Sequence, residues 1–300
     1  MNYLGHLLIT CGGLLAASSL AQGDEPKFTH ELKPALLTAA DSDDRTAAAR
    51  FKFGIEKDAD LGGTATHLFA NTQGTVAWES RINSDNMTAE VGGGVWRRFG
   101  GTVALDLEDP VDPTAPNPLP GNVAGAHDYA VSFDLKLGFE TDQRFENTQL
   151  AYGPRIGFVH TENDGWWPLL PSVDVSFLRI NVLESEFLSA NGVPEHDFWR
   201  LGIDLSWKWR PFEQINVGPR WLKPVGLHAD VRYFRAYDLP TQAKPLDIED
   251  SLYTAGTVSY GTSNLGLKYL QEVYLTVSHG RLPPSTKDET LIFIGISLLK

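Results

Sequence analysis

Charged residues two positions apart recur in this sequence, and their types could support chemistry. His228, Asp230 and Arg232 form one series, and Arg200 and Asp204 belong to another. Because alternate residues of a β-strand point to the same face, each series places its charges side by side. A carboxylate can orient an imidazole as a general base, but hydrolysis also needs a nucleophile or an activated water. The series therefore favour a His–Asp hydrogen bond in a polar network over a catalytic site.

Two further groups of residues contain side-chain types that occur in catalytic centres. Ser278 and His279 are adjacent near the end of an expected strand, so their side chains point to opposite faces and cannot pair as nucleophile and base. Glu195, His196 and Asp197 lie in an expected loop, and a barrel protease would need acidic groups and a His that converge from several loops. No catalytic residue is therefore assigned, and a membrane-embedded hydrolase acting on lipid or peptide stays an alternative function.

No cofactor and no metal site are expected. Residues 41–44 resemble the start of a calcium loop, but Thr46 and Lys52 stand where such a loop has Gly and Glu. The only cysteine, Cys11, lies in an expected signal peptide, so the mature chain has no thiolate ligand. The net charge of −13 at pH 7 argues against a nucleic-acid partner.

The stretches that carry these charges alternate between apolar and polar side chains, which predicts β-strands with one apolar face. In residues 129–140 the apolar series is Tyr129, Val131, Phe133, Leu135, Leu137 and Phe139. Strands of soluble domains have about 5–6 residues, whereas a tilted strand that crosses a bilayer needs about 9–11. The lengths predict an all-β fold, a transmembrane antiparallel up-and-down β-barrel, with a periplasmic sandwich or a lipocalin-like fold as the alternative.

The same alternation gives thirteen candidate strands. They are 27–38, 48–57, 73–82, 87–97, 101–107, 128–140, 148–160, 172–183, 198–210, 225–235, 251–260, 264–278 and 290–299. Single-chain bacterial barrels have even strand numbers, and 101–107 is the shortest candidate and runs into an acidic, proline-rich segment. We therefore expect about 12 strands, with 14 as the alternative, in one domain that covers 22–300.

The N-terminal residues predict export. The apolar stretch from Leu7 to Ala17 is followed by small residues that suit cleavage after Ala21, so residues 1–21 are interpreted as a signal peptide. A membrane anchor is disfavoured because the stretch is shorter than the roughly 18 residues of a helical span. Lipoprotein cleavage at Cys11 is disfavoured because Thr10 precedes it and the apolar stretch continues past it.

With the signal segment, the alternating strands and the final apolar strand 290–300, the mature chain resembles the bacterial outer-membrane β-barrel class, with no specific family identified. The resemblance implies location in the cell outer membrane, contact with its lipid and lipopolysaccharide, and insertion by the barrel assembly machinery. Members typically end in an aromatic residue, whereas this chain ends in Leu298, Leu299 and Lys300.

In such a barrel the faces opposite the apolar ones line the lumen. The expected lumen-lining residues are Asp134, Lys136, Arg155, Arg200, Asp204, Lys208, Arg210, His228, Asp230 and Arg232. Mixed charges of this kind either line a water path or interlock in salt bridges. We therefore expect porin-like passage of small solutes or a structural role. Trimeric porins usually have more strands, which favours a monomer. A loop-based binding or adhesion barrel is a further alternative, with 109–126 and its five prolines as the candidate loop.

Overall fold

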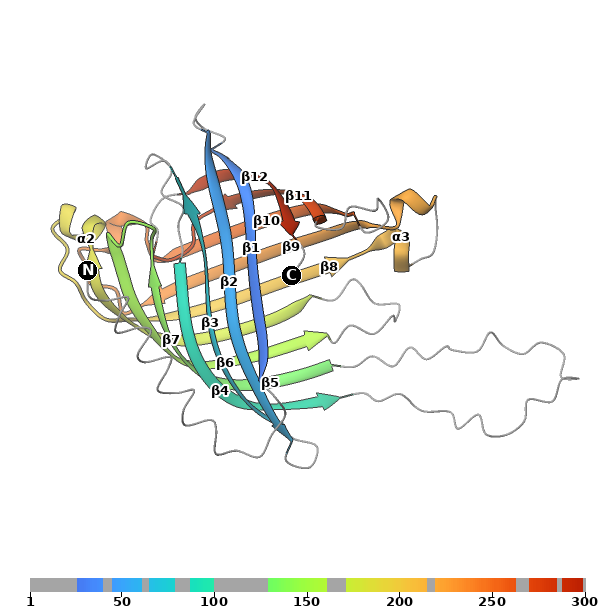
Figure 1. Cartoon of the computed structure of the whole chain (residues 1–300). Coiled ribbons are helices and arrows are strands. Elements are labelled where there is room, and N and C mark those ends of the chain that lie inside the picture. The colour runs from blue at the N-terminus through green and yellow to red at the C-terminus, as the bar shows by residue number, and fades with distance from the viewer. Residues whose placement is uncertain are drawn as a thin grey trace, which may run out of the picture.

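The strands close into one barrel. The computed structural model describes residues 26–39, 45–60, 65–78, 87–99, 129–160, 171–214, 219–262, 270–284 and 288–298. Within these residues each of twelve strands pairs antiparallel with the next, and β1 closes the sheet by pairing with β12 (Figure 1). The prediction of an all-β up-and-down barrel of about 12 strands is confirmed. No helix in the described part of the chain is long and apolar enough to cross a membrane.

Twelve strands and four short helices make up the described structure. The strands are β1 (Lys27–Ala39), β2 (Arg45–Asp60), β3 (Ala65–Ala77), β4 (Met87–Phe99), β5 (Tyr129–Thr141), β6 (Asn147–His160), β7 (Ser172–Ser185), β8 (Phe198–Trp209), β9 (Val225–Tyr237), β10 (Asp250–Gly261), β11 (Leu270–Gly280) and β12 (Glu289–Leu298). The helices are α2 (Glu186–Ala190), α3 (Pro211–Gln214), η2 (Arg220–Leu222) and η3 (Lys244–Leu246).

The two ends of the barrel are named here after the helices that they carry. At the α2 end, β7 leads through α2 into β8, and η3 lies between β9 and β10. At the α3 end, β8 leads through α3 into β9, and this end also holds the start of β1 and the end of β12. Figure 1 shows α2 and α3 on opposite sides of the barrel.

One strand prediction was wrong in its bounds. The strand expected at 73–82 is β3, which begins at Ala65 and ends at Ala77, and Trp78 lies just beyond it. Its two faces differ little in polarity, since His67 and Gln73 alternate with residues such as Thr66, so alternation does not mark its first half. The candidate strand 101–107, the signal peptide 1–21 and the loop 109–126 lie outside the described residues.

The outward face of the barrel is apolar. Large apolar side chains that stay exposed on it include Leu32, Phe53, Leu68, Phe133, Leu135, Ile156, Val175, Val258, Leu275 and Ile294. They come from strands all around the barrel, so they form a belt rather than one patch. A soluble monomer rarely exposes contiguous apolar patches larger than a few hundred Å². The belt has the chemistry of a surface that contacts lipid.

The turn between β5 and β6 is held by one buried carboxylate. Asp142 Oδ1 accepts hydrogen bonds from the backbone N–H groups of Arg144 (3.1 Å) and Glu146 (2.9 Å), and Oδ2 accepts one from Asn147 Nδ2 (2.9 Å). An Asp side chain that satisfies backbone donors in this way fixes a tight turn. The next residue, Gln143, exchanges two hydrogen bonds with the backbone of Ala77, which joins the turn to the end of β3.

Replacing Asp142 by Ala is expected to lower the free energy of unfolding by about 1–3 kcal/mol, because it leaves three donors of this partly buried turn without their acceptor. The measurement is urea unfolding of the purified protein in lipid vesicles. Arg144→Ala is the matched control, since that side chain is exposed in the same turn, and its effect should stay within about 0.5 kcal/mol. Equal losses in the two variants would contradict the role given to the carboxylate.

Candidate functional site

The lumen is the candidate site because the inward faces of the strands carry the charged side chains. Gly92 and Gly94 of β4 leave space in the lumen for side chains of the neighbouring strands. A Cβ at Gly94 would collide with the backbone of Phe133 and with the side chain of Asp134, and one at Gly92 would collide with the ring of Phe69. The glycines therefore allow neighbouring strands to fill the lumen with larger side chains.

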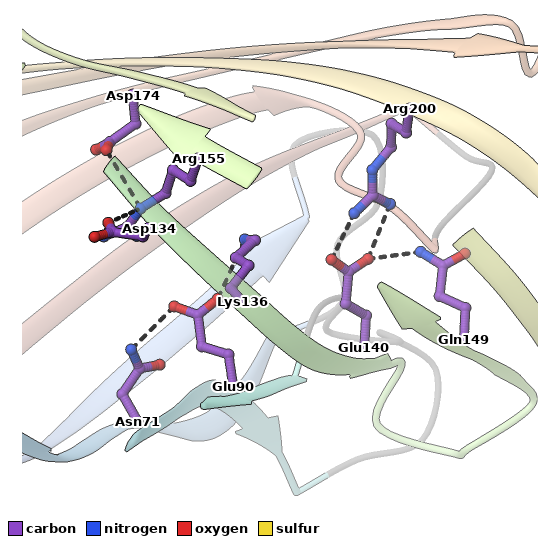
Figure 2. Close-up of polar contacts among 9 residues, drawn as sticks. All are labelled: Asn71, Glu90, Asp134, Lys136, Glu140, Gln149, Arg155, Asp174 and Arg200. Carbon is purple, nitrogen blue, oxygen red and sulfur yellow. Dashed lines mark hydrogen bonds and ion pairs between the residues drawn. The ribbon is translucent and has the colours of Figure 1, made fainter. Parts of the chain in front are cut away.

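Asp134 is the centre of a charge network between β3 and β7. Its side chain is fully buried, and its two oxygens contact His67 Nε2 at 3.0 Å and Arg155 Nη2 at 3.0 Å. Arg155 also reaches Asp174 on β7, with Nε 3.7 Å from Oδ1 (Figure 2), and it lies over the ring of Phe69. Four strands are thus connected through one carboxylate and one guanidinium.

A second group of contacts extends this network along the same half of the lumen. Glu90 of β4 accepts a hydrogen bond from Asn71 Nδ2 (2.9 Å) and one from Lys136 Nζ (3.2 Å), as Figure 2 shows. Each charge has a partner of the opposite sign or a polar neighbour, as burial of ionised groups requires. This part of the interior is therefore a filled, paired network.

The most enclosed pair lies toward the α2 end. Arg200 of β8 donates two hydrogen bonds to Glu140 of β5, from Nη1 to Oε2 (2.9 Å) and from Nη2 to Oε1 (2.5 Å). Gln149 donates a third to the same carboxylate (2.6 Å; Figure 2), and the ring of Phe234 lies under the guanidinium. This two-pronged geometry crosses the lumen between strands that are not neighbours in the sheet.

The other half of the lumen is open. A cavity of about 560 Å³ is lined by residues of β8–β12 and β1–β3. Its lining includes Glu272 and Gly280, which lie near the two ends of β11, so the cavity follows almost the whole strand. Arg50, Lys52 and Lys208 face inward and are nevertheless exposed, because they border this water-accessible space.

The expected lumen-lining residues fall into two groups in the structure. Those in paired contacts are Asp134, Lys136, Arg155 and Arg200. Those that line the cavity are Lys208, Arg210, His228, Asp230 and Arg232. Asp204 faces Arg232 across the pair of β8 and β9.

Sequence reasoning missed the charged wall of β1 and β2. Glu31, Lys33, Arg50 and Lys52 line the same cavity, from strands whose existence was predicted. They repeat at two-residue spacing, which is the signal that could have found them. Glu90 and Glu140, which pair with expected residues, were missed as well.

The His228 series forms a polar contact without the geometry of a catalytic triad. His228 Nε2 lies 3.0 Å from Ser206 Oγ and 3.2 Å from Asp230 Oδ1. In a Ser–His–Asp triad one ring nitrogen faces the serine and the other faces the carboxylate. Here both partners contact the same nitrogen, so the imidazole cannot relay a proton from the serine while the carboxylate orients it.

The other candidate catalytic residues are not brought together either. Ser278 is buried on the inward face, whereas His279 is exposed on the outward face and contacts Thr290 Oγ1 at 2.8 Å. His196 contacts the carbonyl of Pro194, and Asp197 contacts Arg179. The described ranges contain no group of three or more His, Cys, Asp or Glu side chains that could hold a metal ion.

A closed antiparallel barrel of twelve long strands, with an apolar exterior and a charged interior, has the fold of the bacterial outer-membrane β-barrel class. No family model and no curated protein sequence matches the chain.

Solved structures of similar fold are outer-membrane barrels. The NanC porin is 8% identical with a TM-score of 0.39, over 91% of this chain and 100% of the porin. OccK11 (OpdR) of Pseudomonas aeruginosa is 10% identical with a TM-score of 0.37, over 91% and 96%. OmpF of Salmonella typhi, solved in complex with daunomycin, is 7% identical with a TM-score of 0.36, over 92% and 98%. Likeness at this level assigns no activity to the chain, so its function must be argued from its own lumen.

Proposed function

We propose that the protein lies as a monomer in the outer membrane of a bacterium and provides porin-like passage for small solutes. The apolar belt supports the membrane location, since lipid is the environment in which such a surface costs nothing to expose. The partners that follow are outer-membrane lipid, lipopolysaccharide, the barrel assembly machinery and the solutes themselves.

The observation that carries the proposal is the cavity beside β11. It follows the strand from Glu272 to Gly280, and its polar lining includes side chains that are exposed although they face inward. Paired charges fill the opposite half of the lumen, so the path is displaced toward β8–β12 and β1–β3. A barrel filled on all sides would have a purely structural role.

The test is the conductance of single molecules of the full-length mature protein in a planar lipid bilayer. Discrete current steps are expected. Ala255 lines the cavity in the middle of β10. An indole at this position would fill much of the narrow interior of a small barrel. Ala255→Trp should therefore roughly halve the size of the current step.

Val258→Trp is the matched control on the same strand, because Val258 points to the lipid side. It should leave the step size unchanged. Stable insertion without current would refute the passage and favour a structural or loop-based role, and an equal reduction by both Trp variants would refute the path beside β11.

A further inference from the structure

We propose that the passage prefers small anions, such as carboxylates and phosphates, which are held transiently between two basic walls of the cavity. This inference rests on the proposed passage and adds the class of solute to it. It comes from the distribution of charge in the cavity, which differs from that of the whole chain.

The cavity lining is more basic than the protein. Six of its side chains are cationic, namely Lys33, Arg50, Lys52, Lys208, Arg210 and Arg232, and four are anionic. The whole chain has a net charge of −13. An excess of positive charge inside an acidic protein is therefore a local property of the cavity.

The cations lie on two walls that face each other. Arg50 and Lys52 project from β2, and Lys208 and Arg210 lie at the end of β8 and just after it. In the closed order of the barrel β2 and β8 are six strands apart in both directions, so they lie on opposite sides of the lumen. A solute that follows the cavity passes between the two walls.

Among the described residues, three cations that line the cavity lack the close ion pairs that cations have in the filled half of the lumen. Arg50, Lys52 and Lys208 have no ion pair within 4.0 Å in the described structure. Arg50 lies over the ring of Phe293, 5.4 Å from its centre. An aromatic face holds a guanidinium in place without removing its charge.

The four carboxylates cancel this charge only in part. Glu31 pairs with Lys33 and lies across the strand pair from Lys52, and Asp230 contacts His228. Glu272 and Glu289 lie near the α3 end and at the α2 end of the cavity, respectively. Walls of low dielectric constant strengthen the field of the remaining cations and raise the local concentration of counter-ions, which are anions here.

The experiment is the reversal potential of the inserted protein in a gradient of potassium chloride. It is measured at low ionic strength, because at about 1 M salt the screening length falls to about 3 Å. Chloride should permeate severalfold better than potassium. In the double variant Arg50→Glu, Lys52→Glu the reversal potential should move toward that of potassium. The double variant Arg50→Gln, Lys52→Gln should move it partway, and it supplies the test if the acidic variant does not fold.

Lys244→Glu is the control, since Lys244 is exposed on η3 and does not line the cavity. It should leave the reversal potential unchanged. A conducting protein that prefers potassium, or that responds equally to the control, would overturn the anion preference while the passage stands. A silent protein would overturn the proposed passage and the anion preference with it.

Discussion

Replacing Arg200 by Met is expected to lower the free energy of unfolding by about 3–5 kcal/mol, the cost of leaving one member of a buried ion pair without the other. Arg200 is only 4% exposed, and it provides two of the three hydrogen bonds that the Glu140 side chain receives from described residues. After the substitution, Gln149 is the hydrogen-bond partner that the carboxylate keeps among those residues. Urea unfolding in lipid vesicles, followed by tryptophan fluorescence, measures the loss.

The double variant Arg200→Met, Glu140→Met separates the pair from the packing around it. Removing both charges eliminates the unpaired carboxylate, and apolar replacement of a whole buried pair is often close to neutral. The double variant should therefore recover most of the stability that the single variant loses. If both unfold at the same urea concentration, the loss comes from packing rather than from the charge left unpaired.

The sequence predicted which way most side chains point, but not which partners they meet. Alternation places Asp134 and Leu135 on opposite faces, and the structure has the first fully buried and the second exposed on the outer surface. The partner of Arg200 is 60 residues away, on a strand that is not its neighbour. Such a contact depends on the stagger of the closed barrel, which two-residue periodicity does not contain.

The division of the lumen was also beyond sequence reasoning. Lys136 and Lys208 look equivalent in the sequence, as single lysines on the polar face of a long strand. Lys136 contacts Glu90 at 3.2 Å, whereas Lys208 borders the cavity. The two lysines differ because the strands around them carry different side chains, and because the glycines of β4 leave room beside Lys136. Only the closed structure brings those strands together.

Placing an arginine on the outer surface tests whether that surface meets lipid. Leu135 lies in the middle of β5 and is 61% exposed, among the highest values on the apolar belt. A charge on the lipid face at the bilayer midplane costs about 2–4 kcal/mol, so Leu135→Arg should destabilise the inserted barrel by that amount. The measurement is the free energy of unfolding in lipid vesicles, with the yield of inserted protein as a second readout.

The control for Leu135→Arg is Ala255→Arg, which adds the same side chain on the lumen side. Ala255 lines the cavity and lies across the strand pair from Asp230, so water and a carboxylate are available to the new charge. Its stability should change much less than that of Leu135→Arg. In detergent micelles, whose headgroups and water lie closer to the belt, the penalty of Leu135→Arg should shrink. If both variants insert and unfold alike, the exposed apolar side chains do not face a bilayer, and the membrane location proposed for this barrel would be wrong.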